Sequence, residues 1–335
     1  LGLVWAWGGI ALAWVTAWPL RYILAVAKLL SKLPGAVLFT GNRMVVWWLM
    51  LVYAMFGAAW LISRRRKVRY WIPAACSVLA LCAVLTVNAV QLQRTSTVTA
   101  LDVSQGQSIV FSSGRACAVV DCGGRSTAED PGDLAARKLL AQGHRSLDLL
   151  VLTHPHDDHV NGVLRLMHWL PVRTLVIPAA ADTTQAPLSD ILALAEANHT
   201  AVVRVDAERT VTAGGISVHL YPEPCAGQED GSMIVLTSIG DYDTLVPGDV
   251  DTTAEVKFLS NCTYPGIELL LVGHHGSKKS TCDAWLDAIA PDAAIISVGY
   301  NSYGHPTSET LERLQAHNIP IYRTDQMGDI TVHLS

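Results

Sequence analysis

The sequence predicts an α/β domain with two sheets and outer helices, preceded by membrane-associated α-helices. Residues 1–95 hold eight of the ten tryptophans and no acidic residue, because the first acidic residue is Asp102. From residue 96 the chain changes to short apolar runs that alternate with amphipathic segments and turn residues. We therefore expect a membrane segment over residues 1–95 and a folded domain over residues 96–335.

Length and charge set limits on the function. The chain has 335 residues, enough for two such units, and its net charge of −5 gives no general attraction to nucleic acid. Any contact with a polyanion would have to be local. The first residue is Leu, and no basic stretch precedes the first apolar run. We therefore expect a fragment or a processed product rather than a secretory signal.

Two segments have the length and composition of membrane spans. Residues 45–62 hold no ionisable side chain except a tyrosine, and residues 71–90 hold none. A helix of about 20 apolar residues crosses the hydrocarbon layer. The RRRKVR stretch at residues 64–69 lies between them, and short basic loops stay cytoplasmic. The expected location is the cell (inner) membrane, multi-pass, with residues 96–335 on the extracytoplasmic side.

The first apolar stretch has two interpretations. A simple span over residues 3–20 would put its following basic residues opposite the RRRKVR loop, against the positive-inside bias. These residues are Arg21, Lys28, Lys32 and Arg43. Residues 20–33 instead form an amphipathic pattern that is typical of an interfacial helix. A spanning or interfacial helix within residues 3–33 therefore stays open, with breaks expected at Pro19 and Pro34.

The folded part reads as short strands, several of them followed by helices. Asp130 as N-cap, Pro131 in the first turn and Gly143 at the end delimit one helix. The other helices are expected at 160–170, 188–198, 282–290 and 308–318. Strands are expected at 97–103, 107–113, 116–122, 147–153, 174–178, 201–205, within 208–221, and at 232–240, 243–248, 267–273, 293–299, 319–324 and 328–334. Hairpins mixed with strand–helix units predict two sheets with helices outside them.

The stretch THPHDDHVNG at residues 153–162 holds the densest coordinating chemistry of the chain. It follows a buried strand and precedes a helix. His154 and His156 are two residues apart, so an extended backbone presents both to one side. Asp158 and His159 follow at the turn, and imidazole with carboxylate suits zinc, manganese or iron. We expect these pairs to serve two adjacent metals, with Asp157 facing away or acting in an outer shell.

Two more potential ligand groups lie at strand ends downstream. Asp249 in VPGDVD follows a strand, where its carboxylate could bridge two metals. His274 and His275 follow another strand in VGHHGSKKS. Each motif alone is also typical of an ordinary solvated turn. Their occurrence together with the HPHDDH stretch favours a metal site.

This set of motifs resembles the metallo-β-lactamase superfamily. HPHDDH at 154–159 matches its HxHxDH signature, Asp249 its bridging aspartate, and the HHGS stretch its last histidine, as either His274 or His275. The resemblance covers residues 96 to 335 and implies an αββα sandwich with two divalent metals, zinc or manganese, at the edge between the sheets. The usual third-histidine position holds EDGS, 229–232, where Asp230 or Ser232 would substitute and leave one metal site weaker.

A narrower set of motifs resembles the ComEC family of DNA-uptake channels. The motifs are LDVSQGQSI, VVDCGG, TLVPGDVD, HHGSKKS, NSYGHPTSETLERL and YRTDQMGDI. The chain differs at Ser104, Gln107 and Glu229, where that family usually has Gly, Asp and Asn. The resemblance implies that residues 1–95 end a competence channel domain, and that the partners are DNA, membrane lipid and the DNA-uptake machinery.

The mechanism expected from such a site is metal-assisted hydrolysis of phosphodiesters. Asp158 would orient the attacking hydroxide as well as bind metal. His305 in GHP would bind metal or donate a proton to the leaving group. Next to the histidines, Ser277, Lys278 and Lys279 offer a hydroxyl and two charges for phosphate or DNA.

Three functions remain open from the sequence. The first is a nuclease that degrades the non-transported DNA strand. The second is a hydrolase of a small ester, lactone or thioester, and the third is a non-catalytic domain that guides DNA. The seven cysteines form no CxxC motif, which excludes a zinc finger, but they leave one disulfide possible among the last five if that domain is outside the cytoplasm.

Overall fold

The computed structural model describes residues 6–30, 43–92, 94–125, 129–222 and 232–334. Its α-helices are α1 (Ala6–Leu30), α2 (Arg43–Ser63), α3 (Trp71–Leu92), α4 (Pro131–Ala141), α5 (Asp157–Val160), α6 (Val163–Trp169), α7 (Leu188–Ala197), α9 (Thr252–Asn261), α10 (Asp283–Ile289), α11 (Ser308–Ala316) and α12 (Thr324–Met327). Its strands are β1 (Ser96–Ala100), β2 (Ile109–Ser113), β3 (Ala116–Val120), β4 (Leu147–Val151), β5 (Val172–Pro178), β6 (Ala201–Val205), β7 (Arg209–Ala213), β8 (Ile216–Tyr221), β9 (Ile234–Ile239), β10 (Tyr242–Val246), β11 (Leu269–Leu271), β12 (Ala293–Ile296), β13 (Ile321–Arg323) and β14 (Ile330–Leu334).

The strands form two seven-stranded sheets with similar plans. The first has the order β14-β1-β2-β3-β4-β5-β6, and the second has the order β13-β12-β11-β10-β9-β8-β7. One half of each sheet is antiparallel, and the other half is parallel: β3 to β6 in the first and β10 to β13 in the second. Parallel strands have their carboxyl ends at the same edge of a sheet, and the loops with the candidate metal ligands start at these ends.

Alternate residues of one strand face different layers of the domain. In β3, Ala118 and Val120 pack between the two sheets, while Cys117 and Val119 pack against the helices outside the first sheet. The two-residue period of a strand explains this division. Because both faces of β3 are buried, the strand is apolar throughout.

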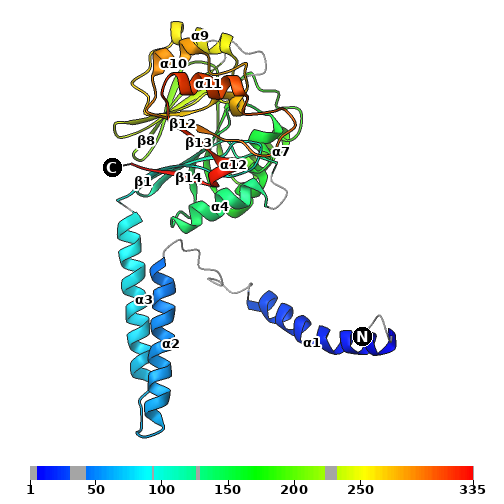
Figure 1. Ribbon diagram of the computed structural model, residues 1–335, viewed down its shortest axis with the longest axis vertical. Coiled ribbons are helices and arrows are strands. Elements are labelled where there is room, and N and C mark those ends of the chain that lie inside the picture. The colour runs from blue at the N-terminus through cyan, green and yellow to red at the C-terminus, as the bar shows by residue number, and fades with distance from the viewer. Residues whose placement is uncertain (1–5, 31–42, 93, 126–128, 223–231, 335) are drawn as a thin grey trace. The chain divides into compact units, whose positions relative to one another are not determined.

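Helices cover the outer face of each sheet. α4, α6 and α7 pack on the first sheet, and α9, α10 and α11 pack on the second. Figure 1 labels all of these helices except α6. The architecture is therefore the expected αββα sandwich. Asp130 caps α4 as predicted, since its carboxylate accepts a hydrogen bond from the Gly132 amide at 2.8 Å.

Two described helices, α2 and α3, are long and apolar enough to cross a membrane by length and composition. They pack on each other, and the Trp48 indole donates a 2.8 Å hydrogen bond to the main-chain oxygen of Ser77. Their other side chains are largely exposed, for example Trp47 at 67% and Leu79 at 70%. Large apolar side chains left in contact with the surroundings on both helices mark them as a pair that needs an apolar environment.

α1 is a single helix that belongs to a separate unit, residues 1–40. The break expected at Pro19 is wrong, because Pro19 lies inside α1. Lys32 and Pro34 lie outside the described residues. α1 is not among the described helices that meet the criteria for crossing a membrane, so the choice between an interfacial and a spanning helix stays a prediction.

Other expectations need correction or extension. The helix expected at 160–170 is two short helices, α5 and α6, because α5 starts earlier, within the histidine motif. α9 and α12 follow strands and were not predicted.

No disulfide joins the cysteines of the described ranges, and Cys225 lies outside them.

A buried carboxylate joins two of the helices on the second sheet. Glu255 of α9 accepts hydrogen bonds from the main-chain amides of Thr281 and Cys282 at the start of α10. Removing it leaves the buried amide of Thr281 and the partly buried amide of Cys282 without an acceptor, and a buried unsatisfied donor costs about 1–3 kcal/mol. Glu255→Ala should therefore lower the free energy of unfolding by about 3 kcal/mol, whereas Glu255→Gln, which keeps one acceptor, should lose less. Equal denaturation midpoints for both variants and the parent chain would contradict this role.

Candidate metal centre

Three loops at the carboxyl ends of strands supply the side chains expected to bind metal. The loop after β4 carries His154 and His156 into α5. Asp249 follows β10, and His274 and His275 lie in the short 3₁₀ turn after β11. β4 belongs to the first sheet, whereas β10 and β11 belong to the second. The candidate ligands therefore gather where the two sheets meet at one edge.

Glycines allow these loops to approach each other closely. Gly248 has a φ of +63°, and a Cβ there would lie 3.1 Å from the side chain of Thr153. A Cβ on Gly123 would lie 2.4 Å from the main-chain nitrogen of His159. A larger residue at Gly123 would push the ligand loops apart, because backbone atoms cannot yield as a flexible side chain can, whereas at Gly248 the positive φ itself favours glycine.

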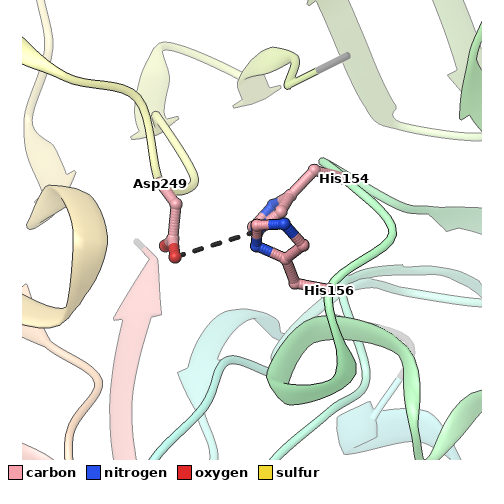
Figure 2. Close-up of side chains that lie close together, drawn as sticks. All are labelled: His154, His156 and Asp249. Carbon is pink, nitrogen blue, oxygen red and sulfur yellow. Dashed lines mark ion pairs between the residues drawn. The ribbon is translucent and has the colours of Figure 1, made fainter. Parts of the chain in front are cut away.

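The structure brings the candidate ligands together in two groups of three. One consists of His154, His156 and Asp249, and the other consists of Asp158, His159 and His275. Within each group the ligand atoms lie within 4.8 Å of one another. The two histidines of the first group face Asp249 across the site (Figure 2).

Asp249 faces both groups. Its Oδ1 lies 3.2 Å from His159 Nε2 and 3.7 Å from His275 Nε2. Its Oδ2 lies 3.8 Å from His154 Nε2 and 3.6 Å from His274 Nε2. A carboxylate with one oxygen toward each group has the arrangement required to bridge two cations.

Buried polar atoms without partners test whether a metal fits here. Among the described residues, His154 Nε2, His159 Nε2, His275 Nε2 and Asp249 Oδ1 are buried and make no hydrogen bond. Leaving such atoms unsatisfied costs free energy, so their presence in the two groups needs an explanation. One divalent cation in each group would satisfy all four.

The second ring nitrogens fix these imidazoles for metal binding. His275 Nδ1 lies 2.9 Å from the main-chain oxygen of Ser297, which can only accept a hydrogen bond. His159 Nδ1 lies 2.7 Å from the carboxylate of Asp121. In both, Nδ1 carries the proton and Nε2 keeps a free lone pair in the metal-free neutral form, as ligating histidines require. The donor set therefore fits a divalent metal such as zinc or manganese.

Sequence comparison agrees with this geometry. The model of the metallo-beta-lactamase superfamily matches residues 101–300 of the chain, a range that holds all three ligand loops. The chain belongs to the metallo-β-lactamase superfamily.

Curated relatives of the chain include a protein of the ComE operon and a competence protein. ComE operon protein 3 of Bacillus subtilis is 29% identical over 251 residues, which are 69% of this chain and 32% of that protein. Competence protein ComA of Neisseria gonorrhoeae is 29% identical over 238 residues, 69% of this chain and 31% of that protein. The chain thus matches about a third of each relative, and the predicted resemblance to the competence family is confirmed.

Among solved structures, the metallo-β-lactamase fold protein YhfI from Bacillus subtilis aligns with a TM-score of 0.49 and 13% identity. The alignment covers 72% of this chain and all of that one.

Asp121 is a site residue that the sequence analysis missed. It is buried at the end of β3 with a φ of +58° and accepts hydrogen bonds from the amide and the hydroxyl of Thr153, both at 2.7 Å. It also accepts from Gln107 Nε2 at 2.8 Å and from His159 Nδ1. Because the Thr153 hydroxyl proton points to Asp121, its oxygen is free to accept from His154 Nδ1 at 3.0 Å. Asp121 thus orients one histidine of each group, directly or through Thr153.

The charges of the metallo-β-lactamase centre are strongly coupled. Burial lowers the pKa of His159, but the carboxylates of Asp249 and Asp121 outweigh it and hold that pKa well above its usual value. Burial raises the pKa of Asp249, but the surrounding histidines, His159 first, hold it well below its usual range. Burial lowers the pKa of His154 and His275. Without metal, one proton therefore stays on His159 and partly replaces the missing positive charge.

This proton predicts how metal affinity depends on pH. A cation needs the Nε2 lone pair of His159, so its binding must displace the proton. Affinity for zinc should tighten as pH rises, by up to about tenfold per pH unit, until pH exceeds the raised pKa of His159. Competition titrations with a zinc chelator between pH 6 and pH 8 measure this slope. An affinity that stays constant over that range would contradict the assignment.

A cavity of about 470 Å³ opens beside the two groups. Its lining includes Asp158, Asp249 and His275, together with His274 and His305. The rings of His274 and His305 lie 5.6 Å apart, and His305 Nδ1 is buried without a hydrogen-bond partner. Burial lowers the pKa of His305. His305 belongs to neither metal group, so its position fits contact with a substrate better than metal binding.

The structure distinguishes the paired histidines and the paired aspartates. Both histidines line the cavity, but His275 is buried and belongs to a metal group, whereas His274 is 39% exposed and belongs to neither group. Both have positive φ, +50° and +54°, and their Nε2 atoms approach different oxygens of Asp249, Oδ2 for His274 and Oδ1 for His275. Asp157 is exposed, belongs to neither group and lines the cavity.

The residues expected to bind phosphate do not line the cavity, and their role stays a prediction. Ser277 is buried, and its hydroxyl accepts a hydrogen bond from the amide of Lys279 at 3.3 Å. Lys278 and Lys279 are exposed, and none of these three residues lines the cavity. Residues that closely follow His275 in sequence therefore do not have to line the cavity.

The expected substitutes for a third histidine are also absent from the two groups. Ser232 is buried but belongs to neither group, and Asp230 lies outside the described residues. His199 lies exposed after α7, and His219 pairs with Thr210 at 2.8 Å on β8. The group of His154, His156 and Asp249 therefore has no further histidine among the described residues.

Proposed function

We propose that the metallo-β-lactamase domain hydrolyses phosphodiester bonds of DNA, acting on the strand that is not transported during DNA uptake. The single observation that carries the proposal is the position of Asp249 between two groups of metal ligands. A centre that holds two cations side by side suits a phosphodiester, whose attacking and leaving oxygens both need charge stabilisation.

Two divalent ions, zinc or manganese, would supply a water of lowered pKa and positive charge for the phosphodiester oxygens. His159, His275, Asp158 and Asp249 offer four ligands to one ion. His154 and His156 with Asp249 offer three to the other, which we propose is the weaker site. Asp158 has a second role, because its free oxygen can accept a hydrogen bond from the attacking water and orient it.

His305 is the proposed group at the leaving oxygen. It lines the same cavity as Asp249, and its buried Nδ1 has no other partner. The lowered pKa favours the neutral ring, which can donate a hydrogen bond through one nitrogen. His305 would thus stabilise the developing alkoxide through this hydrogen bond, and the proton that the leaving oxygen takes up would come from water.

The two candidate membrane spans, α2 and α3, support a location of the hydrolase domain outside the cytoplasm. The basic stretch at residues 64–69 joins α2 to α3, and short basic loops stay cytoplasmic. With residues 1–95 as a membrane segment and residues 96–335 as the hydrolase, the hydrolase would then be extracytoplasmic on the cell (inner) membrane. The relatives named ComE operon protein 3 and competence protein ComA support DNA, membrane lipid and the DNA-uptake machinery as partners.

Purified chain in detergent, loaded with zinc or manganese, tests the proposal on single-stranded DNA and on a lactone. We expect cleavage of DNA that is lost in His156→Ala and kept in His333→Ala, a control at an exposed histidine of β14. Cleavage of the lactone alone would support a small-molecule hydrolase instead. Binding of DNA without cleavage of either substrate would support a guiding domain.

A further inference from the structure

The loop over residues 299–305 forms a rigid aromatic feature at the cavity. Asn301 Oδ1 accepts hydrogen bonds from the main-chain amides of Tyr303 and His305 at 3.1 and 3.0 Å. Asn301 Nδ2 donates to the main-chain oxygens of Gly299 and His305, both at 2.8 Å. One side chain thus makes four bonds to the main chain and fixes the loop before any ligand binds.

This loop directs one tyrosine to the cavity and another to solvent. Tyr303 lines the cavity and is 57% exposed, so part of its ring is free for contact. Tyr300 is 98% exposed and is not part of the lining. An exposed aromatic ring on a rigid loop beside a polar cavity is typical of a stacking surface.

Rings continue from Tyr303 to the metal ligands. The rings of Tyr303 and His305 lie 5.8 Å apart with an angle of 30° between their planes, and the rings of His305 and His274 lie 5.6 Å apart. His274 Nε2 in turn lies 3.6 Å from Asp249 Oδ2. A nucleotide with its phosphate at Asp249 could therefore place a neighbouring base along this row.

A permanent cation lies beside the same tyrosine. The guanidinium carbon of Arg125 is 5.8 Å from the centre of the Tyr303 ring, within the range of a cation–π contact. Arg125 is the only Lys or Arg among the described residues that line the cavity, whose acidic members are Asp157, Asp158 and Asp249. A guanidinium forms bidentate hydrogen bonds with phosphate, so it can hold a backbone phosphate next to a stacked base.

We propose that Tyr303 and Arg125 form a nucleotide subsite, in which Tyr303 stacks on a base and Arg125 binds the adjoining phosphate. The inference deepens the proposed function, on which it rests, by naming a base-recognising element outside the metal centre. It predicts a preference for unpaired nucleic acid, because a base must be unstacked to pack on Tyr303.

Binding measured without added metal keeps this inference separate from hydrolysis. Fluorescence anisotropy compares an oligothymidylate with an abasic oligomer of equal length and charge, using the full chain in detergent. The parent chain should bind the oligothymidylate at least about fivefold more tightly, the lower end of the effect of one stacked base. Tyr303→Ala should remove this preference, and Tyr303→Phe should keep it.

Matched variants identify the source of any change. Tyr300→Ala alters the same loop outside the cavity and should leave the preference intact. Arg125→Ala should weaken binding of both oligomers by a similar factor, because both carry phosphates. Equal affinities of the parent chain for both oligomers, or an unchanged preference in Tyr303→Ala, would overturn the subsite. Failure of the metal-loaded chain to cleave DNA would instead overturn the proposed hydrolysis and leave these binding results standing.

Discussion

Asp249→Asn should lower the rate of DNA hydrolysis at least about 1000-fold and reduce the bound metal to at most one ion per chain. The loss equals about 4 kcal/mol of transition-state stabilisation, the scale of a catalytic metal. The reason is that the Asp249 carboxylate lies within 4 Å of histidine nitrogens from both groups. The neutral amide keeps the shape but removes the charge shared by two cations. Cleavage assays and metal analysis of the purified variant measure both effects.

Asp241→Asn is the matched control, since Asp241 is exposed in the turn between β9 and β10. It should keep the metal content and the rate of the parent chain. Retention of two metals and full activity in Asp249→Asn would show that this carboxylate does not bridge the groups.

The second large effect is expected at Asp121. Asp121→Asn should weaken zinc binding about 10–100-fold, the usual cost of losing a group that orients a metal-bound histidine. Asparagine tolerates the φ of +58°, so the backbone is preserved, but one acceptor oxygen becomes a donor. That amide would face donors from Gln107, Thr153 and His159. Zinc affinity from competition titration measures the effect.

A separate measurement distinguishes positioning from general destabilisation. Without the negative charge of Asp121, the raised pKa of His159 should fall, because Asp121 is one of the two carboxylates that raise it. The dependence of zinc affinity on pH should then be shallower than in the parent chain. An affinity and a pH slope equal to those of the parent chain would exclude Asp121 from the centre.

Much of the fold and the position of the candidate ligands follow from local sequence. HPHDDH directly follows an apolar run too short for a helix, so strand, loop and ligands could be inferred together. Asp249 and the histidine pair likewise follow apolar runs. Parallel strands bring such ends to one edge, which is why separated motifs could be expected to meet.

The remaining details depend on tertiary contacts that local patterns do not contain. Sequence alone does not show which of His274 and His275 faces the ligand groups. His275 is oriented by a hydrogen bond to the main-chain oxygen of Ser297, which directly follows β12. Asp121 resembles an ordinary turn residue, and only its four donors show its role. The VVDCGG motif was the available signal, because a buried aspartate after a strand needs such partners.

Proximity along the chain does not predict which basic residues line the cavity. Lys278 and Lys279 closely follow the histidines in sequence, yet they are exposed and do not line the cavity. Arg125 and Tyr303 lie far apart in sequence, but both line the cavity. Arg125 follows β3 of the first sheet, and Tyr303 lies between β12 of the second sheet and α11. Pro19 was also misjudged, since a proline weakens a helix but does not always end it.

Anomalous X-ray diffraction from zinc-loaded crystals tests the central claim most directly. Two zinc peaks are predicted, one bound by His154 and His156 and the other bound by Asp158, His159 and His275. The carboxylate of Asp249 should contact both peaks. Zinc peaks located away from these side chains, or none within coordination distance of Asp249, would contradict the account.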